Sequence, residues 1–218
     1  MAFDYKKEYK EYYSPPRKPE LIVIPEMRFL AVRGTGNPNA PEGAYQQAIA
    51  QLYATAYTLR MSQKAGKNIE GFFEYVVPPL EGLWQQNGMQ GTMLDYSRKD
   101  DLKWISMIRL PDFISEADVQ WAIAEAGRKK KISCENVEFF TYDEGLCVQA
   151  LHIGSYDSEP DTVARMLEYL TEQECEANHT NRRLHHEIYL SDPRRTAPEK
   201  CKTVIRIPAK RIGSQEHI

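Results

Sequence analysis

A carboxylate lies in the middle of a strand-like segment, "HHEIY", near the C-terminal end of the chain. Glu is uncommon in strands because its charge does not suit a half-buried pleated surface, so Glu187 needs an explanation. Side chains alternate across a strand, which puts His185, Glu187 and Tyr189 on one face and His186 and Ile188 on the other. We expect the second, more apolar face to pack against helices. Glu187 then faces either water or a groove, and in a ring-lined groove it could serve as an acid, a base or a cation anchor.

Aromatic residues that could hold a flat ligand beside Glu187 are spread along the sequence. Trp84 and Trp104 stand out because each lies near a strand end in polar sequence, "EGLWQQNG" and "DDLKWIS", and planar ligands stack at the mouths of grooves. Aromatic residues in strands also form ordinary core, and that alternative stays open for each of them. The candidates are Tyr75, Trp84, Trp104, Phe140, Tyr142, Tyr156 and Tyr189.

Other chemistries have weaker support. His185 and Glu187, two positions apart, could both contact a metal, but no third ligand follows at a characteristic spacing, so we expect no metal and no other cofactor. His152 lies in a strand and is interpreted as a structural histidine. The sequence contains no GxSxG, P-loop or GxGxxG motif. The four cysteines lack CxxC spacing, which indicates buried free thiols in a reducing compartment.

Composition excludes several classes of protein. The chain has 218 residues, 42% of them hydrophobic and 27% charged, which is typical of one globular domain. A net charge of -3 is too close to neutral for a protein that binds nucleic acid through phosphate contacts. No run of about 18 apolar residues is present, so no membrane span is expected. The N-terminus lacks the apolar core of a signal peptide, and we expect a cytoplasmic protein.

Hydrophobic periodicity and turn residues predict an alternation of strands and helices. Ser115 is a plausible N-cap with Asp118 three residues later, as in a capping box, and Pro160 fits the first turn of a helix. Gly145 ends a turn, Asp143-Glu144-Gly145, that predicts a β-hairpin. The predicted strands cover 27–34, 71–77, 102–111, 185–192 and 202–211, the helices 44–64, 115–130 and 158–177, and the hairpin 136–154.

The order strand–helix–strand–strand occurs twice, and three pairs of segments support an internal duplication. "SMIRLP" (106–111) matches "TVIRIP" (203–208), and "AVRG" corresponds to "LHIG". "FFEYVVPP" aligns with "HHEIYLSD", which makes Glu74 the repeat partner of Glu187. We therefore predict an α+β fold of two antiparallel modules, 20–111 and 137–211, joined by the helix at 115–130.

With these segments in order, the chain resembles the GyrI-like small-molecule-binding family. It is most similar to the stand-alone bacterial branch described as cyclopropanoid cyclohydrolases. The resemblance covers nearly all of residues 20–210 and is carried by "FLAVRGTGNPN", "FEYVVPPLEGLW", "KWISMIRLPDF", "CVQALHIGSYDSEP" and "HHEIYLSDPRRTAPEK". One departure is that this branch has a tandem Trp after "EGL", whereas Gln85 follows Trp84 here.

The resemblance implies a GyrI-like, SOUL-like pair of modules whose sheets form a central groove for flat, apolar, often cationic or electrophilic compounds. An acidic residue in the groove commonly meets the ligand, which assigns that role to Glu187, with Glu74 as its partner. In the hydrolase branch the groove adds water to the strained cyclopropane of DNA-alkylating natural products, which detoxifies them and confers resistance. By analogy, Tyr189 or Tyr142 donates to the carbonyl. The residues expected to hold the ligand are Trp84, Trp104, Tyr75, Phe140, Tyr156 and His185.

Alternative functions within the same resemblance remain open. A non-catalytic protein could sequester or sense flat drugs, and the sequence does not separate it from the enzyme. Sensors of this family carry a helix-turn-helix, for which the roughly 20 residues before the first predicted strand are too few. A topoisomerase inhibitor needs a strongly acidic surface, which a net charge of -3 does not supply. The expected partner is a planar hydrophobic small molecule, not nucleic acid or a membrane, and the chain is expected to be a monomer or a homodimer.

Overall fold

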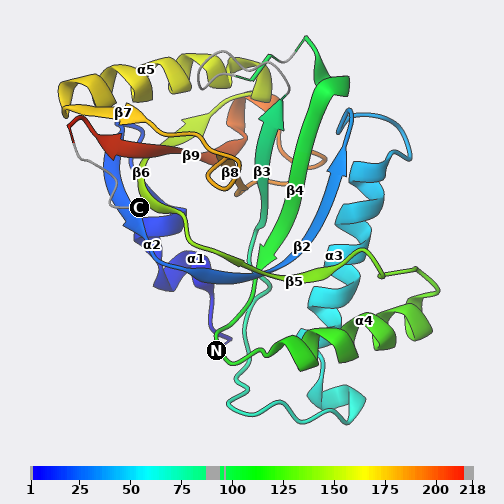
Figure 1. The fold of residues 1–218 in the computed structure, drawn as a ribbon. Coiled ribbons are helices and arrows are strands. Elements are labelled where there is room, and N and C mark those ends of the chain that lie inside the picture. Colours follow the sequence, from blue (N-terminus) through cyan, green and yellow to red (C-terminus); the bar gives the residue numbers. More distant parts are fainter. Residues whose placement is uncertain (1, 87–93, 96, 214–218) are drawn as a thin grey trace.

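The computed structural model describes residues 2–86, 94–95 and 97–213, which form one antiparallel sheet of nine strands with helices packed on it (Figure 1). The strand order is β1-β6-β9-β8-β3-β4-β2-β5, and β7 pairs with β9 off this path. The predicted α+β class with antiparallel strands is confirmed, and both halves contribute to a single sheet. The strands are β1 (Glu20–Ile24), β2 (Met27–Thr35), β3 (Leu80–Gln86), β4 (Leu102–Arg109), β5 (Glu138–Tyr142), β6 (Gly145–Ile153), β7 (Cys175–Ala177), β8 (His185–Tyr189) and β9 (Lys202–Arg211).

Two long helices lie over opposite ends of the sheet. Helix α3 (Ala44–Arg60) packs on β2 and β4 and has α4 (Glu116–Lys130) against it, while α5 (Glu159–Glu172) packs on β6 and β9 (Figure 1). Leu52 and Leu59 of α3 are fully buried, as is Met166 of α5. The central strands β3 and β8 lie between these two packed regions.

The helix boundaries follow the predicted local signals. Ser115 Oγ accepts a hydrogen bond from the Asp118 backbone N–H at 3.3 Å, and Asp118 Oδ2 accepts one from the Ser115 N–H at 3.1 Å. The capping box is therefore confirmed. Pro160 lies in the first turn of α5, where its missing N–H costs no helical hydrogen bond.

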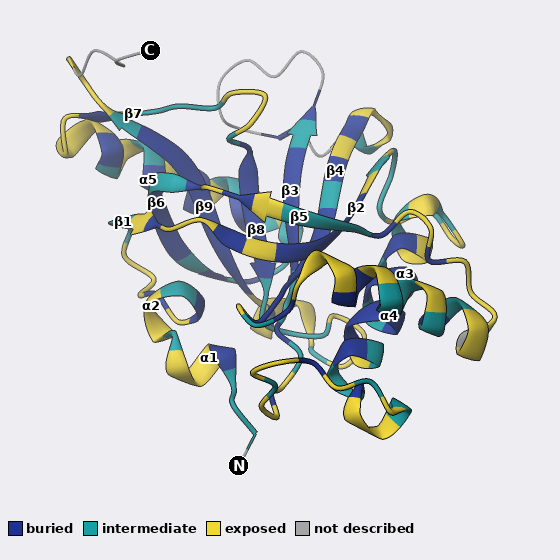
Figure 2. Cartoon of the chain, turned by 60° about the horizontal axis from the view of Figure 1, so that its bottom comes forward, coloured by how far each residue is buried: buried dark blue, intermediate teal, exposed yellow. Residues whose placement is uncertain are grey.

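The N-terminal segment covers the opposite face of the sheet. Two short helices, α1 (Tyr5–Glu8) and α2 (Lys10–Tyr13), bring tyrosine rings against Ile188 and Val204. The guanidinium carbon of Arg109 lies 4.6 Å from the ring centroid of one of these tyrosines, Tyr9, in a cation–π contact. Figure 2 shows the strands mostly buried and α1 and α2 exposed on their outer sides.

The predicted hairpin at 136–154 is wrong. β5 pairs with β2 at one edge of the sheet, whereas β6 pairs with β1 and β9 in the other half. The connection between β5 and β6 carries Glu144 into the interior, where its Oε1 lies 2.9 Å from His186 Nδ1 and its Oε2 accepts from Arg206 Nη1 at 3.2 Å. A buried ionic contact between distant residues therefore overrides the local turn signal.

The predicted strand at 71–77 is also wrong. These residues are not in a regular strand, although Tyr75 forms an isolated bridge with Phe3. The prolines at 78 and 79 precede a strand instead of ending one, and it is β3, beginning at Leu80, that pairs with β8. Glu74 is exposed and outside the sheet, so its alignment with Glu187 is wrong.

The composition led us to expect buried free thiols and no membrane-spanning helix. Cys134, Cys147, Cys175 and Cys201 are all buried and free, as their spacing predicted. Among the described residues, no helix combines the length and the apolar character that crossing a membrane requires.

Candidate functional site

Glu187 lies at the centre of the sheet, on the face that carries α3 and α5. Cross-strand partners share a face, and one row of partners connects the α3 end of the sheet to the α5 end. Glu187 is only 5% exposed, which excludes the alternative that its carboxylate faces water. The row consists of Val32, Ser106, Gly82, Glu187, Ile205 and Ala150.

The expectation that His186 and Ile188 face these helices is wrong. Ile188 packs against the N-terminal tyrosines, and His186 Nε2 lies 3.0 Å from Glu81 Oε2 on the same side. The N-terminal segment, for which no helices were predicted, supplies the cover on that face. Glu187 therefore shares its side of the sheet with the long helices.

A chain of two hydrogen bonds ends at the Glu187 carboxylate. Tyr189 Oη donates to Glu187 Oε2 at 2.8 Å, and Trp84 Nε1 donates to Tyr189 Oη at 2.9 Å. Burial, followed by the charge of Glu187, raises the pKa of Tyr189 well above its ordinary value. The phenol thus stays protonated at neutral pH.

Aromatic rings from four elements enclose this phenol–carboxylate pair. The ring centroid of Tyr45, on α3, lies 5.5 Å from that of Trp84 and 5.1 Å from that of Trp104. Tyr156 meets Tyr189 edge-on with centroids 6.0 Å apart. Trp104 can fold over its cross-strand partner only because that partner is Gly34, where a Cβ would fall 2.2 Å from the indole ring.

Two further polar side chains approach Glu187. Glu159, the first residue of α5, and His185 each place a potential ligand atom within 4.8 Å of the other and of Glu187. All three residues are buried.

Both ring nitrogens of His152, on β6, have partners in the second half of the chain. Nδ1 lies 2.9 Å from Thr162 Oγ1, and Nε2 lies 3.1 Å from the Ser155 carbonyl oxygen. Burial lowers the pKa of His152, in keeping with a neutral structural histidine.

The absence of a side chain at Gly82 makes room for the hydrogen bonds to Glu187. A Cβ at Gly82 would lie 2.8 Å from Trp84 Nε1 and 3.1 Å from Tyr189 Oη. We expect Gly82→Ala to lower the free energy of unfolding by about 1–3 kcal/mol and to shift tryptophan emission, because both rings must move. Denaturant unfolding followed by fluorescence measures both effects. Gly127→Ala is the matched control, since its Cβ would meet only Ile132 O at 3.6 Å. Equal stability of the Gly82 variant and wild type would contradict this packing.

Four of the predicted site residues lie elsewhere. Phe140 and Tyr142 stack on each other on the opposite face, where Tyr142 also meets His186 edge-on, because β5 pairs with β2 at the sheet edge. Tyr75 is buried with the N-terminal tyrosines. Glu74 lines a small surface pocket beside the end of α3. The residues that the structure brings together are Trp84, Trp104, Tyr156, His185, Glu187 and Tyr189.

Sequence reasoning missed Tyr45 and Glu159. In the sequence, Tyr45 is the second residue of the predicted helix 44–64, and Glu159 precedes Pro160 at the start of the predicted helix 158–177. These positions indicate the starts of two helices, and neither of them indicates a ligand-binding site. Only the packing of α3 and α5 on one face of the sheet places these residues near Glu187.

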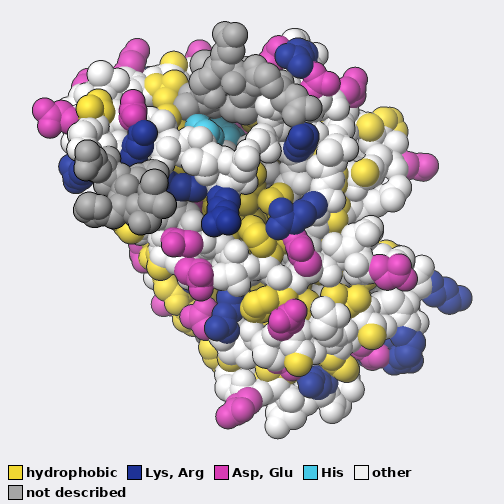
Figure 3. Space-filling view, in the orientation of Figure 1, with side chains coloured by type: hydrophobic (Ala, Val, Ile, Leu, Met, Phe, Trp, Pro, Cys, Tyr) yellow, Lys and Arg dark blue, Asp and Glu magenta, His cyan; other side chains and the backbone are white. Residues whose placement is uncertain are grey.

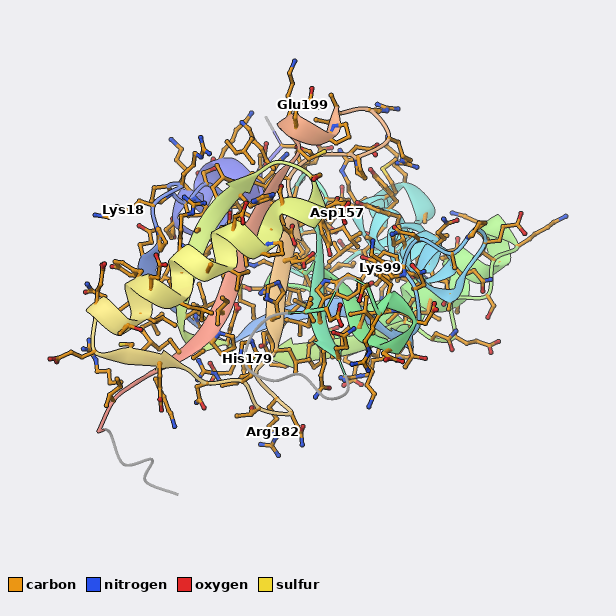
Figure 4. The ribbon with its side chains drawn as sticks, turned by 90° about the horizontal axis from the view of Figure 1, so that it is seen from above. Lys18, Lys99, Asp157, His179, Arg182 and Glu199 are labelled. Atoms are coloured by element: carbon orange, nitrogen blue, oxygen red, sulfur yellow. The ribbon has the colours of Figure 1, made fainter. Side chains whose placement is uncertain are left out.

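An ion pair connects the two halves of the molecule near the helix ends. Lys99 Nζ, before β4, lies 3.7 Å from Asp157 Oδ1, before α5, and Figure 4 shows this pair between α5 and α3. On the face seen in Figure 3, acidic and basic side chains are interspersed, with hydrophobic side chains between them. This face therefore presents a mixed surface and not a field of one sign.

Comparison with known proteins identifies a family and relatives that share this fold. The model of the GyrI-like small molecule binding domain matches residues 17–210. A crystal structure of a hydrolase from Listeria innocua is 40% identical, with a TM-score of 0.86, over 95% of this chain and 100% of that one. An uncharacterized conserved protein from Listeria innocua is 42% identical, with a TM-score of 0.88 and the same coverage. No curated protein matches the chain.

Proposed function

Because the chain belongs to the GyrI-like small-molecule-binding family, we propose that it binds flat hydrophobic compounds beside Glu187 and hydrolyses strained cyclopropane rings in DNA-alkylating natural products. Such hydrolysis would protect a cell from the alkylator. The observation that carries the proposal is the buried contact of 2.8 Å between the Tyr189 hydroxyl and the Glu187 carboxylate. The sequence identity of 40% to a Listeria innocua hydrolase supports an enzymatic role.

The chemistry needs one proton acceptor and one donor. Water attacks a cyclopropane carbon, a carbon–carbon bond of the ring breaks, and its electron pair moves onto the conjugated carbonyl oxygen. Glu187 takes the proton of the attacking water as a general base. Tyr189, which stays protonated, turns its single O–H from Glu187 to the substrate oxygen on which charge develops. The product is the substrate plus one water molecule, so no oxidant or other reactant is required.

Ring-bearing side chains would hold the flat body of the substrate. Trp84 donates to the Tyr189 hydroxyl, Tyr156 meets the Tyr189 ring edge-on, and Tyr45 meets Trp104 edge-on. Trp104 Nε1 is buried with no hydrogen-bond partner among the described residues, and an unpaired buried N–H is costly. A carbonyl of the ligand could accept from it. Tyr75 and Tyr142 lie on the opposite face and receive no role in this proposal.

Product formation under multiple turnover tests the proposal. The protein is incubated with an excess of a spirocyclopropane alkylator, and the water adduct is quantified by mass spectrometry against a protein-free reaction. We expect more than one equivalent of adduct per chain. A loss of one equivalent of free compound without adduct would instead identify a sequestering binder. Unchanged free compound would contradict both functions.

A further inference from the structure

A histidine and two glutamates form a compact buried group on the α5 side of the sheet. His185 and Glu187 share a face of β8, and Glu159 reaches them from the first position of α5. One ligand atom from each residue lies within 4.8 Å of the other two. His185 is 1% exposed, Glu187 5% and Glu159 0%. This inference goes beyond the proposed hydrolysis and does not depend on it.

The contact between His185 and Glu187 is close but is not a hydrogen bond. His185 Nε2 lies 3.2 Å from Glu187 Oε1, yet neither ring nitrogen has a hydrogen-bond partner in the part of the chain that the structure describes. An imidazole buried without partners costs free energy, so its environment is incomplete. Two ligand atoms that are each about 2.0–2.2 Å from a metal, at right-angled or tetrahedral angles, lie roughly 3–3.5 Å apart. The separation of 3.2 Å matches that geometry.

The surroundings of Glu187 leave one of its oxygens available. Glu187 Oε2 accepts from Tyr189 Oη, which in turn accepts from Trp84 Nε1. Hydrogen bonds of this kind orient the ligating carboxylates of metal sites and fix which oxygen faces the ion. Oε1 is then directed toward His185, on the side where Glu159 approaches.

We propose that Glu159, His185 and Glu187 bind one divalent transition-metal ion of the zinc, cobalt or manganese class. One imidazole nitrogen with two carboxylates is a mixed ligand set that suits these ions, whereas Mg²⁺ and Ca²⁺ prefer oxygen ligands alone. Two carboxylates and a neutral imidazole balance a charge of +2. Three protein ligands leave coordination positions for water. A competing explanation is that His185 and Glu187 form a direct ion pair, with no metal between them.

Titration of the chelator-treated full chain with CoCl₂ and ZnCl₂ distinguishes these explanations. We expect one Co²⁺ per chain, detected by visible d–d absorption, and displacement of Co²⁺ by Zn²⁺. His185→Gln and Glu159→Gln should each weaken binding by at least 10- to 100-fold. Glu168→Gln, at an exposed position of the same helix, is the control and should bind as wild type does.

Each outcome bears on the site. Absence of stoichiometric binding, or equal affinity of wild type and both ligand variants, would overturn the proposal and leave the ion pair. Near-UV circular dichroism establishes that the variants are folded. If one is not folded, Zn²⁺-induced shifts of the His185 ring signals in wild-type NMR spectra provide the second test, and unshifted His185 signals would overturn the proposal. Because no substrate is used, metal binding and hydrolysis can fail independently.

Discussion

Replacing Glu187 with glutamine is expected to lower the turnover of a cyclopropane substrate by about 10²- to 10⁴-fold, the usual contribution of a general base. The amide matches the shape of the carboxylate, so Tyr189 can still donate to its oxygen and the site keeps its packing. The amide cannot accept a proton from water. We expect ligand affinity to change far less than the turnover number, and steady-state measurement of adduct formation separates the two.

The control for this prediction is again Glu168→Gln, an identical chemical change at an exposed position on α5. Its turnover should equal that of wild type. Ligand affinity of the Glu187 variant is measured by quenching of tryptophan fluorescence, because Trp84 and Trp104 are within the site. Wild-type turnover by the Glu187 variant would remove Glu187 from the catalytic role. An equal loss of affinity and turnover would make it a binding residue only.

Local signals in the sequence predicted the three long helices and the positions of six of the nine strands that the structure describes. The capping box at Ser115 and the proline in the first turn of α5 are short-range features, and both were confirmed. The hairpin and the strand at 71–77 failed because pairing depends on distant partners. Glu144 leaves its turn to reach His186 and Arg206, and no periodicity within the connection encodes that contact.

The difference between local signals and long-range contacts also explains which residues of the candidate site were predicted and which were missed. Strand alternation correctly grouped His185, Glu187 and Tyr189, because that grouping needs only the two-residue period of one strand. It could not decide which face the helices cover. Tyr142 was misplaced because its strand pairs at the sheet edge, and Glu159 was missed because it reaches the site only through the packing of α5.

A second buried group of charges lies on the opposite face, beneath the N-terminal segment. Glu144 contacts both His186 and Arg206, and Glu81 Oε2 lies 3.0 Å from His186 Nε2. Arg206 Nη2 also donates to the Tyr12 carbonyl at 2.7 Å. The bond to Tyr12 fastens the N-terminal segment to β9, next to the strand that carries Glu187.

The charges of this group perturb one another. Burial alone would raise the pKa of Glu144, but the charges of His186 and then Arg206 outweigh it and lower the pKa to about 2. Burial would lower the pKa of His186, but the charge of Glu144 and the hydrogen bonds that the His186 ring donates to Glu144 and Glu81 raise it to about 9. In the native protein both residues are therefore charged across the neutral range.

Removing the Glu144 charge is expected to destabilise the fold by roughly 3–5 kcal/mol, because Glu144→Gln leaves two buried cations without their shared anion. The stability that Glu144 contributes is present above its unfolded pKa of 4.5 and is lost as pH falls toward 2. The contribution of His186 is present below pH 6.5 and is lost as pH rises through about 9.

The difference in unfolding free energy between wild type and Glu144→Gln should therefore be largest between about pH 4.5 and 6.5 and smaller at pH 10, as measured by urea denaturation. His186→Gln, which removes the titrating partner, should flatten the decline above pH 6.5. A wild-type minus Glu144→Gln difference that does not decline between pH 6.5 and 10 would show that the contact between Glu144 and His186 is not an ion pair.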